Sequence, residues 1–81
     1  MLNDNESVAL FRQYGKRLYN TALRITLSPD ESDEIMQETL IRFITGPMTG
    51  VSDASKVWAW LRTTCVRLSI DWLRSRKRFV S

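Results

Sequence analysis

The chain has 81 residues, of which 43% are apolar, so it fits one small domain and is too apolar for a disordered segment. One cysteine and no histidine exclude an internal disulfide and a structural zinc site, and no apolar run approaches the roughly 18 residues of a membrane span. The polar, acidic start does not resemble a secretory signal. We expect a single domain over residues 1–81 that is cytoplasmic and binds no metal, cofactor or membrane.

The net charge of +3 hides an asymmetry along the chain. Residues 1–40 carry four basic and seven acidic side chains, a net charge of −3, whereas residues 41–81 carry eight basic and two acidic ones, a net charge of +6. An acidic region and a basic region on one small domain suggest two different partners, although charge spread for solubility would give the same totals.

The first predicted helix spans about residues 4–27, with Asn3 or Asp4 as its N-cap. Apolar residues recur at steps of three and four over five turns, which indicates one face packed on a core. These residues are Val8, Phe11, Tyr14, Leu18, Ala22 and Ile25. Gly15 interrupts the pattern, either by chance or because another helix approaches closely there.

The second predicted helix spans about residues 29–45 and begins with several agreeing signals. Ser28 is a good N-cap, Pro29 suits the first helical position, and Glu31 completes a Ser-x-x-Glu capping box. Gly46 and Pro47 end the helix. Its expected core face consists of Met36, Leu40, Phe43 and Ile44, with Ile35 further round.

A second face of this helix combines Glu34, Gln37, Glu38 and Ile41. A hydrophobic side chain beside carboxylates and an amide is not needed for folding, and this mixture suits a docking surface. Single exposed apolar residues are common, however, so a solvated acidic face with one isolated Ile explains the same spacing.

Residues 46–55 have the composition of a loop, and ten residues is long for a link between helices. Ser52, Asp53 or Ser55 can cap a third helix over about residues 55–78. The core face of this helix consists of Val57, Trp58, Leu61, Cys65, Leu68 and Trp72. A long loop beside a basic helix can contact a ligand, or it can be a tolerated insertion.

The third helix also carries a cationic stripe of Arg67, Arg74 and Arg78, with Arg76 and Lys77 nearby. Asp71 can pair with Arg67 and Arg74, but the basic residues greatly exceed this one carboxylate, so the stripe points to phosphate rather than to a salt-bridged face. Trp58 and Trp60 diverge by about 200° around the helix, so one indole should be partly exposed. That indole can stack on unpaired bases, or both indoles can seal the edges of the core.

Nothing in the sequence supports an enzyme, because it has no histidine, no glycine-rich phosphate loop and no Cys/His pair. Cys65 is expected to be a small core residue. A helix-turn-helix DNA reader would need a short turn before its last helix, and the ten-residue loop argues against one.

Three segments together resemble region two of the bacterial sigma-70 family of transcription initiation factors, most closely the extracytoplasmic-function (ECF) group. The first helix of that family is similar to FRQYGKRLYNTALRI (residues 11–25), and its acidic helix is similar to SDEIMQETLIRF (residues 32–43). Its Trp-Leu…Asp-x-x-Arg helix with a basic end is similar to WLRTTCVRLSIDWLRSRKR (residues 60–78). The similarity covers about residues 8–78 and implies an all-α domain of three helices, with room for a short extra helix.

The resemblance implies that the acidic helix docks on the coiled-coil clamp helices of the largest subunit of core RNA polymerase. The residues that would make this contact are Asp33, Glu34, Gln37, Glu38 and Ile41.

The resemblance also implies that the loop and the third helix recognise and melt the promoter minus-ten element. A base of the non-template strand would be flipped into a pocket formed by the loop residues Met48, Thr49, Gly50, Val51 and Ser52. The residues near the DNA would be Trp58, Arg62, Arg67, Arg74, Arg76, Lys77 and Arg78.

The chain departs from the family pattern in two ways. The family often has Asn at the position of Arg67, where it helps to read the minus-ten element, whereas Arg can meet phosphate or guanine. The region-four helix-turn-helix domain, which reads the minus-thirty-five element, has no counterpart in these 81 residues, so we expect a fragment of a longer factor rather than a stand-alone relic. The main alternative is a helical protein-interaction module whose basic end binds an acidic protein, such as an anti-sigma factor, without DNA-reading activity of its own.

Overall fold

The computed structural model describes the backbone of residues 3–80 and the side chains of residues 3–76. Its elements are α1 (Asp4–Thr26), α2 (Pro29–Thr45), the 3₁₀ turn η1 (Pro47–Gly50) and α3 (Ala54–Val80), and the described residues contain no strand. The expected all-α fold of three helices with a short extra one is confirmed, because η1 is that extra element and lies within the segment that reads as a loop.

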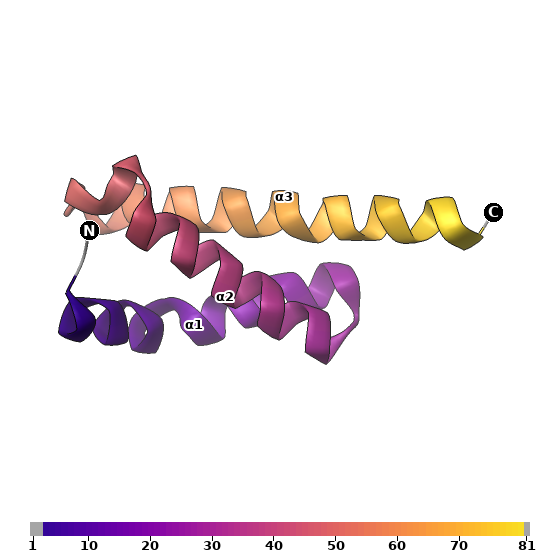
Figure 1. Ribbon diagram of the computed structural model, residues 1–81, viewed down its shortest axis with the longest axis horizontal. Coiled ribbons are helices and arrows are strands. Elements are labelled where there is room, and N and C mark those ends of the chain that lie inside the picture. The colour runs from indigo at the N-terminus through magenta and orange to yellow at the C-terminus, as the bar shows by residue number, and fades with distance from the viewer. Residues whose placement is uncertain (1–2, 81) are drawn as a thin grey trace.

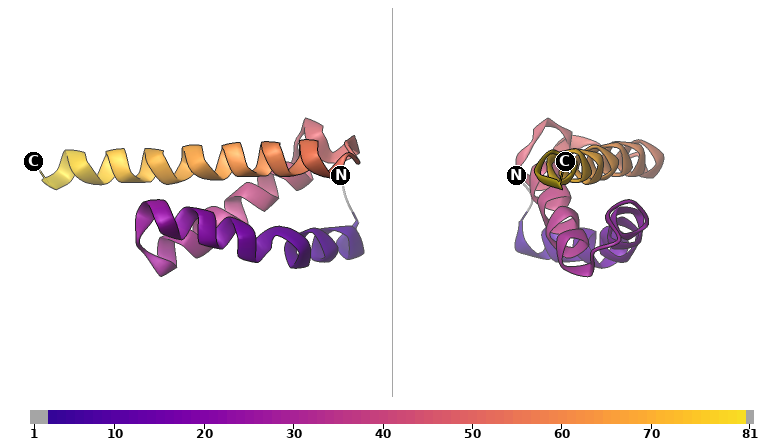
Figure 2. Two further views of the ribbon diagram at one scale, coloured as in Figure 1. Left: turned by 180° about the vertical axis from the view of Figure 1, so that it is seen from behind. Right: turned by 90° about the vertical axis from the view of Figure 1, so that its right-hand side faces the viewer.

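The three helices lie side by side, with α1 and α3 running in the same direction and α2 running back between them (Figure 1). η1 lies at the end of the molecule where α1 and α3 begin. The C-terminal part of α3 continues past the ends of α1 and α2 as a straight projection (Figures 1 and 2). The extents of 43 × 20 × 19 Å reflect this long helix.

Side-chain caps fix where the first two helices begin. Asn3 caps α1 in a reciprocal box, since its side chain accepts from the Glu6 N–H at 2.8 Å and the Glu6 carboxylate accepts from the Asn3 N–H at 3.3 Å. Ser28 caps α2 by accepting from the Glu31 N–H at 3.2 Å. The return bond of the expected second box does not form, because the Ser28 N–H donates to Thr26 Oγ1 at 3.2 Å instead.

Asp53 caps α3, which decides among the three candidates that the sequence offers. Its Oδ1 accepts from the Ser55 hydroxyl at 2.7 Å, the Ser55 N–H at 3.0 Å and the Lys56 N–H at 3.4 Å. The hydroxyl hydrogen bond, followed by the two backbone ones, lowers the pKa of the Asp53 carboxyl below its ordinary value of 3.8. This carboxylate therefore serves the start of α3.

The core lies where the three helices meet, and every helix contributes to it. Cys65 is fully buried there, as expected, and its Sγ donates to the Leu18 carbonyl at 3.4 Å, which joins α3 to α1. Burial raises the pKa of its thiol above the ordinary value. The buried apolar residues are Tyr14, Leu18, Ala22, Ile35, Met36, Leu40, Phe43, Val57, Leu61 and Cys65.

Five apolar residues lie where the sequence did not place them. Ile35 belongs to the core, whereas the expected core residues Ile25 and Ile44 are only half-buried. Val8 and Phe11, expected on the core face of the first helix, are 50% and 47% exposed. The reason is the direction of α2, which runs diagonally away from the N-terminal turns of α1 toward the start of α3 (Figure 1). α2 therefore does not cover the apolar side chains of those first turns, Val8 and Phe11.

Gly46 ends α2 because the backbone of the preceding turn lies too close for a side chain. A Cβ at this position would lie 2.5 Å from the Arg42 carbonyl oxygen. Gly15 differs, because a Cβ there would meet Phe11 at 3.5 Å and Met36 at 3.8 Å, which are ordinary contact distances. Close approach of a helix therefore does not require glycine at position 15.

Candidate functional site

The exposed face of α2 carries all five residues that the sequence predicts for polymerase binding. Asp33, Glu34, Gln37, Glu38 and Ile41 are each exposed, and they lie opposite the side of α2 that packs on the core. We call these five residues the α2 ridge. Its chemistry is the expected mixture of carboxylates, an amide and an aliphatic side chain.

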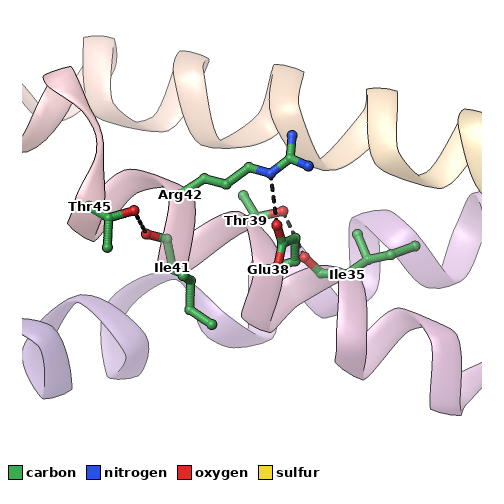
Figure 3. Close-up of polar contacts among 6 residues, drawn as sticks. All are labelled: Ile35, Glu38, Thr39, Ile41, Arg42 and Thr45. Atoms are coloured by element: carbon green, nitrogen blue, oxygen red, sulfur yellow. Dashed lines mark hydrogen bonds and ion pairs between the residues drawn. The ribbon is translucent and has the colours of Figure 1, made fainter.

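Hydrogen bonds along the helix hold part of the α2 ridge in place. Gln37 Nε2 donates to Asp33 Oδ2 at 2.9 Å, and Arg42 Nε donates to Glu38 Oε1 at 2.9 Å (Figure 3). Figure 3 also shows Ile41 pointing to the other side of the helix from Arg42, toward α1. Glu34 and Glu38 thus lie at the edge of the ridge that faces α3, and Ile41 lies at the edge that faces α1.

An apolar groove borders the ridge on the side of α1. It has a volume of about 280 Å³ and is lined by Ser7, Val8, Phe11, Gln37, Leu40, Ile41 and Ile44. We call it the α1/α2 groove. Three of the large apolar residues that are about half exposed or more, Val8, Phe11 and Ile41, line this groove. The sequence missed the first two because they fit the core spacing of their helix.

A second groove borders the ridge on the side of α3. It has a volume of about 270 Å³ and is lined by Glu31, Glu34, Ile35, Glu38 and Leu68. We call it the α2/α3 groove. Its floor is aliphatic and its rim is acidic, so a partner segment that carries both basic and apolar side chains would match it. Glu31 was not among the predicted site residues, although it lies one turn before Glu34 on the same edge.

The loop after α2 forms one wall of a pocket. The pocket has a volume of about 410 Å³, and Thr49, Gly50, Val51 and Ser52 line it. The other walls include Glu6, Leu10 and Gln13 of α1 and Val57 of α3. The fifth predicted loop residue, Met48, does not line the pocket and packs against the core instead.

Both tryptophans at the start of α3 seal the edges of the core. Trp58 stacks on Tyr14 with ring centroids 5.9 Å apart and 11° between the planes, and the Arg17 guanidinium lies 3.8 Å from the Trp58 ring centroid. Trp60 meets Phe43 edge to face with centroids 5.7 Å apart. Both indoles are half-buried, and a guanidinium covers Trp58, so this indole is not an open platform for a base.

The predicted DNA-binding arginines divide between two sides of α3. Arg67 and Arg74 are exposed and share the side that faces away from the core, since seven residues amount to a rotation of only about 20°. Arg62 is also exposed, but it lies about 140° round the helix from Arg67, because it comes five residues earlier. Arg76 is exposed and packs over Trp72, with its guanidinium 5.1 Å from the ring centroid.

The cationic side of α3 is not neutralised locally. Asp71 has the spacing to pair with Arg67 or Arg74 but makes no ion pair with either. Within the part of the chain whose side chains are described, the ion pair that forms is Arg42–Glu38. The side chains of the predicted residues Lys77 and Arg78 lie outside that part. Unpaired cations on an exposed face are available to phosphate.

Among the described side chains, no three His, Cys, Asp or Glu residues form a group that could hold a metal ion. In the same part of the chain, no helix has the length and hydropathy needed to cross a membrane.

Comparison with known families gives one match. The family model described as Sigma-70 region 2 matches residues 10–79, which takes in most of α1, all of α2 and η1, and nearly all of α3. No curated protein and no solved structure matches the chain.

Proposed function

The chain belongs to the Sigma-70 region 2 family, a family of transcription factor modules rather than of enzymes, and from that premise we propose how it works. The general role of the family is to bind core RNA polymerase and to recognise promoters. In our proposal the chain is the region-two module of a cytoplasmic factor of the ECF group. It holds the polymerase through α2 and the minus-ten element through the loop and α3.

The polymerase contact that we propose is the α2 ridge, docked on the clamp helices of the largest subunit. The observation that carries it is the exposure of all five predicted residues on one side of α2, where none of them is needed for the core. Hydrogen bonds within the ridge support it too, because side chains that are already ordered lose less conformational freedom on binding.

The α1/α2 groove extends this proposed contact. An interface needs a desolvated apolar centre as well as polar contacts, and acidic residues alone do not provide one. Ile41 belongs to both the ridge and the groove, and Val8 and Phe11 stand on the opposite wall. An aliphatic side chain of the clamp inserted among these three would bury surface that this chain leaves half exposed.

The contact is tested by pull-down of the 81-residue chain on a purified clamp fragment, comparing the native chain with Gln37→Ala/Glu38→Lys and with Phe11→Ser. Each variant should weaken binding by about tenfold or more, since each removes a central contact. The matched control is Asp71→Lys, which makes the same charge reversal as Glu38→Lys at an exposed carboxylate of α3. It should bind the clamp like the native chain.

Circular dichroism of every variant separates lost contact from lost fold. A native chain that is folded but does not bind the clamp would overturn the polymerase contact. If Asp71→Lys weakened clamp binding as much as the ridge variant does, the effect would follow from net charge alone.

The promoter contact that we propose uses the pocket behind the loop and the outward side of α3. The non-template strand would lie along Arg67 and Arg74, and one unpaired base would enter the pocket lined by Thr49 to Ser52. A mixed polar and apolar lining supports this, because a flipped base is held by hydrogen bonds at its edge and by contacts to its faces. Arg67, where the family often has Asn, would contact phosphate or guanine.

An anti-sigma factor is a second partner that the same surfaces could take. The α2/α3 groove, with an acidic rim and an aliphatic floor, suits a basic amphipathic helix of such a protein. In this version the chain binds proteins and does not read DNA. Two assays test this alternative. In a competition assay, a regulator that covers the α2 ridge should displace the clamp fragment. In a DNA-binding assay, a chain without DNA-reading activity should bind a minus-ten strand and a scrambled strand equally.

A further inference from the structure

We propose that the side of the molecule where α1 meets α3 is a second phosphate-binding surface for a nucleic-acid backbone, with Arg17 as its central contact. It consists of Arg17 and Arg24 of α1 and Arg62 and Arg76 of α3, and we call it the α1/α3 flank. It lies on a different side of α3 from the outward pair Arg67 and Arg74. Neither a polymerase contact nor a particular promoter is required for it.

Arg17 is held in place by an aromatic stack. Its guanidinium lies 3.8 Å from the centroid of Trp58 and 5.9 Å from that of Tyr14, which in turn stacks on Trp58. A guanidinium that rests on a ring by its face keeps its N–H groups at its edge, where they can bind a phosphate in a bidentate manner. Trp58 therefore acts as a positioning residue for Arg17.

The flank has no carboxylate to neutralise it over most of its length. Residues 7–29 contain no Asp or Glu, so Arg17 and Arg24 share an α1 stripe without a local counter-charge. The two arginines are seven residues apart and differ by about 20° in direction. Both are exposed.

α3 continues the flank with the same combination of side chains. Arg62 lies one turn after Trp58, about 40° round the helix, and is exposed. Arg76 lies on the same side of α3 as Trp58, about 27 Å further along, and it too packs over a tryptophan. Two Arg–Trp pairs on one side of a long basic helix form an extended cationic track, which suits a polyanion better than a single acidic side chain.

The favoured ligand is a phosphate backbone rather than an acidic protein surface. Four exposed guanidinium groups, two of which rest on indole rings, match a line of phosphate charges, whereas protein interfaces need a desolvated apolar core. Single strands and duplexes present the same phosphate chemistry, so the two are distinguished by experiment.

The test measures binding of the 81-residue chain to a fluorescent oligothymidylate of about 12 nucleotides, and to a duplex of the same length, over a series of salt concentrations. The variants are Arg17→Ala and, as matched control, Arg12→Ala, an exposed arginine about 140° away on the same helix. Loss of one phosphate contact should lower the salt slope by about 0.7 for the single strand or about 0.9 for the duplex, which is about an eightfold loss of affinity at 0.05 M salt for the single strand. The nucleic acid for which Arg17→Ala lowers the slope is the ligand.

Three further variants test the positioning role and guard against misfolding. Trp58→Leu should weaken binding, and Arg17→Ala/Trp58→Leu should weaken it no further than Arg17→Ala alone, because Trp58 acts through Arg17. If Arg17→Ala is poorly helical by circular dichroism, Arg62→Ala takes its place, since Arg62 makes none of the ring contacts described for Arg17.

The proposal is overturned if a folded Arg17→Ala chain keeps the native slope on both nucleic acids, because the stack with Trp58 would then serve stability only. It is also overturned if Arg12→Ala lowers the slope as much, since the effect would then follow net charge. Failure of clamp binding would leave this result unaffected.

Discussion

α2 and α3 pack on the same core with similar apolar spacing, yet they carry opposite charge. α2 has five carboxylates and one arginine, a net charge of −4, whereas α3 has seven basic residues and one aspartate, a net charge of +6. The buried residues of both helices are mostly apolar, four of six on α2 and three of four on the described part of α3. The contrast therefore lies entirely in the exposed sides, which folding leaves unconstrained.

The two helices also differ in how their charges are used. On α2, Glu38 pairs with Arg42 and Asp33 accepts from Gln37, whereas the described cations of α3 form no ion pair. Exposed ion pairs contribute about 0–1 kcal/mol, so neither pattern has much effect on stability. This difference is the one expected under our proposal, in which the ordered acidic ridge binds a protein and the unpaired arginines bind phosphate.

Removal of a core side chain should abolish both functions at once, because both helices depend on the same packing. Leu61→Ala removes a fully buried side chain and should lower the free energy of unfolding by about 2–5 kcal/mol, measured by urea denaturation with circular dichroism. In a domain of this size, such a loss can exceed the whole stability margin.

The matched control for this change is Ile41→Ala, which removes an aliphatic side chain that is 52% exposed. Its stability should stay within about 0.5 kcal/mol of the native chain, while its clamp affinity falls. If Ile41→Ala destabilised the chain as much as Leu61→Ala, the α2 ridge would be part of the fold and its assignment to a partner would fail.

Removal of the outward arginines should affect the DNA contact and leave the protein contact intact. Arg67→Ala/Arg74→Ala should lower the salt slope for a single strand by about 1.4, which is about a 60-fold loss of affinity at 0.05 M salt. Clamp binding, measured by pull-down, should not change, because neither residue belongs to the α2 ridge or lines either of the grooves beside it. Equal loss of both activities would show that the two helices serve one composite surface.

The junction between the two helices depends on Gly46. Gly46→Ala would bring a Cβ to 2.5 Å from the Arg42 carbonyl oxygen, and relief of that overlap should cost about 1–3 kcal/mol of unfolding free energy. Gly50→Ala is the control, because a Cβ there meets nothing within 4 Å and should leave stability unchanged or slightly raised. Equal stability of the two variants would mean that η1 adjusts freely and does not fix the loop pocket.

Local signals predicted the helices well, because each helix is specified by residues close together in the chain. Asn3, Ser28 and Asp53 are caps whose hydrogen bonds reach only two or three residues along the chain, so the starts of all three helices could be inferred. The α2 ridge could be inferred as well, since one helical period brings its members together. The exposure of these residues could be inferred too, because the core face predicted for the helix lies on its opposite side.

Features that depend on how the helices cross could not be predicted. Val8 and Phe11 follow the core spacing but lie where α2 has diverged from α1, and no local pattern reports that divergence. The stack of Arg17 on Trp58 joins residues far apart in sequence, so the spacing of residues within either helix could not reveal it. Asp71 has the spacing for ion pairs and makes none, because exposed pairs gain too little to fix long side chains.

The acid dependence of stability should reveal a carboxylate that serves folding rather than a partner. The pKa of Asp53 is lowered in the folded chain, so its hydrogen bonds stabilise the fold above the pKa of the unfolded state and are lost as pH falls through the region below 3.8. Asp53→Asn keeps an acceptor for the cap but does not titrate. Its unfolding free energy, measured by urea denaturation between about pH 5 and pH 2.5, should depend less on pH than that of the native chain.

Ser55→Ala sharpens this test because the Ser55 hydroxyl is the largest cause of the lowered pKa. Without this hydroxyl, the pKa of Asp53 should move back toward 3.8. The unfolding free energy should then depend less steeply on pH, although the carboxylate remains. If Ser55→Ala and Asp53→Asn both retained the native pH profile, the hydrogen bonds of the Asp53 cap would not be the source of the acid dependence of stability.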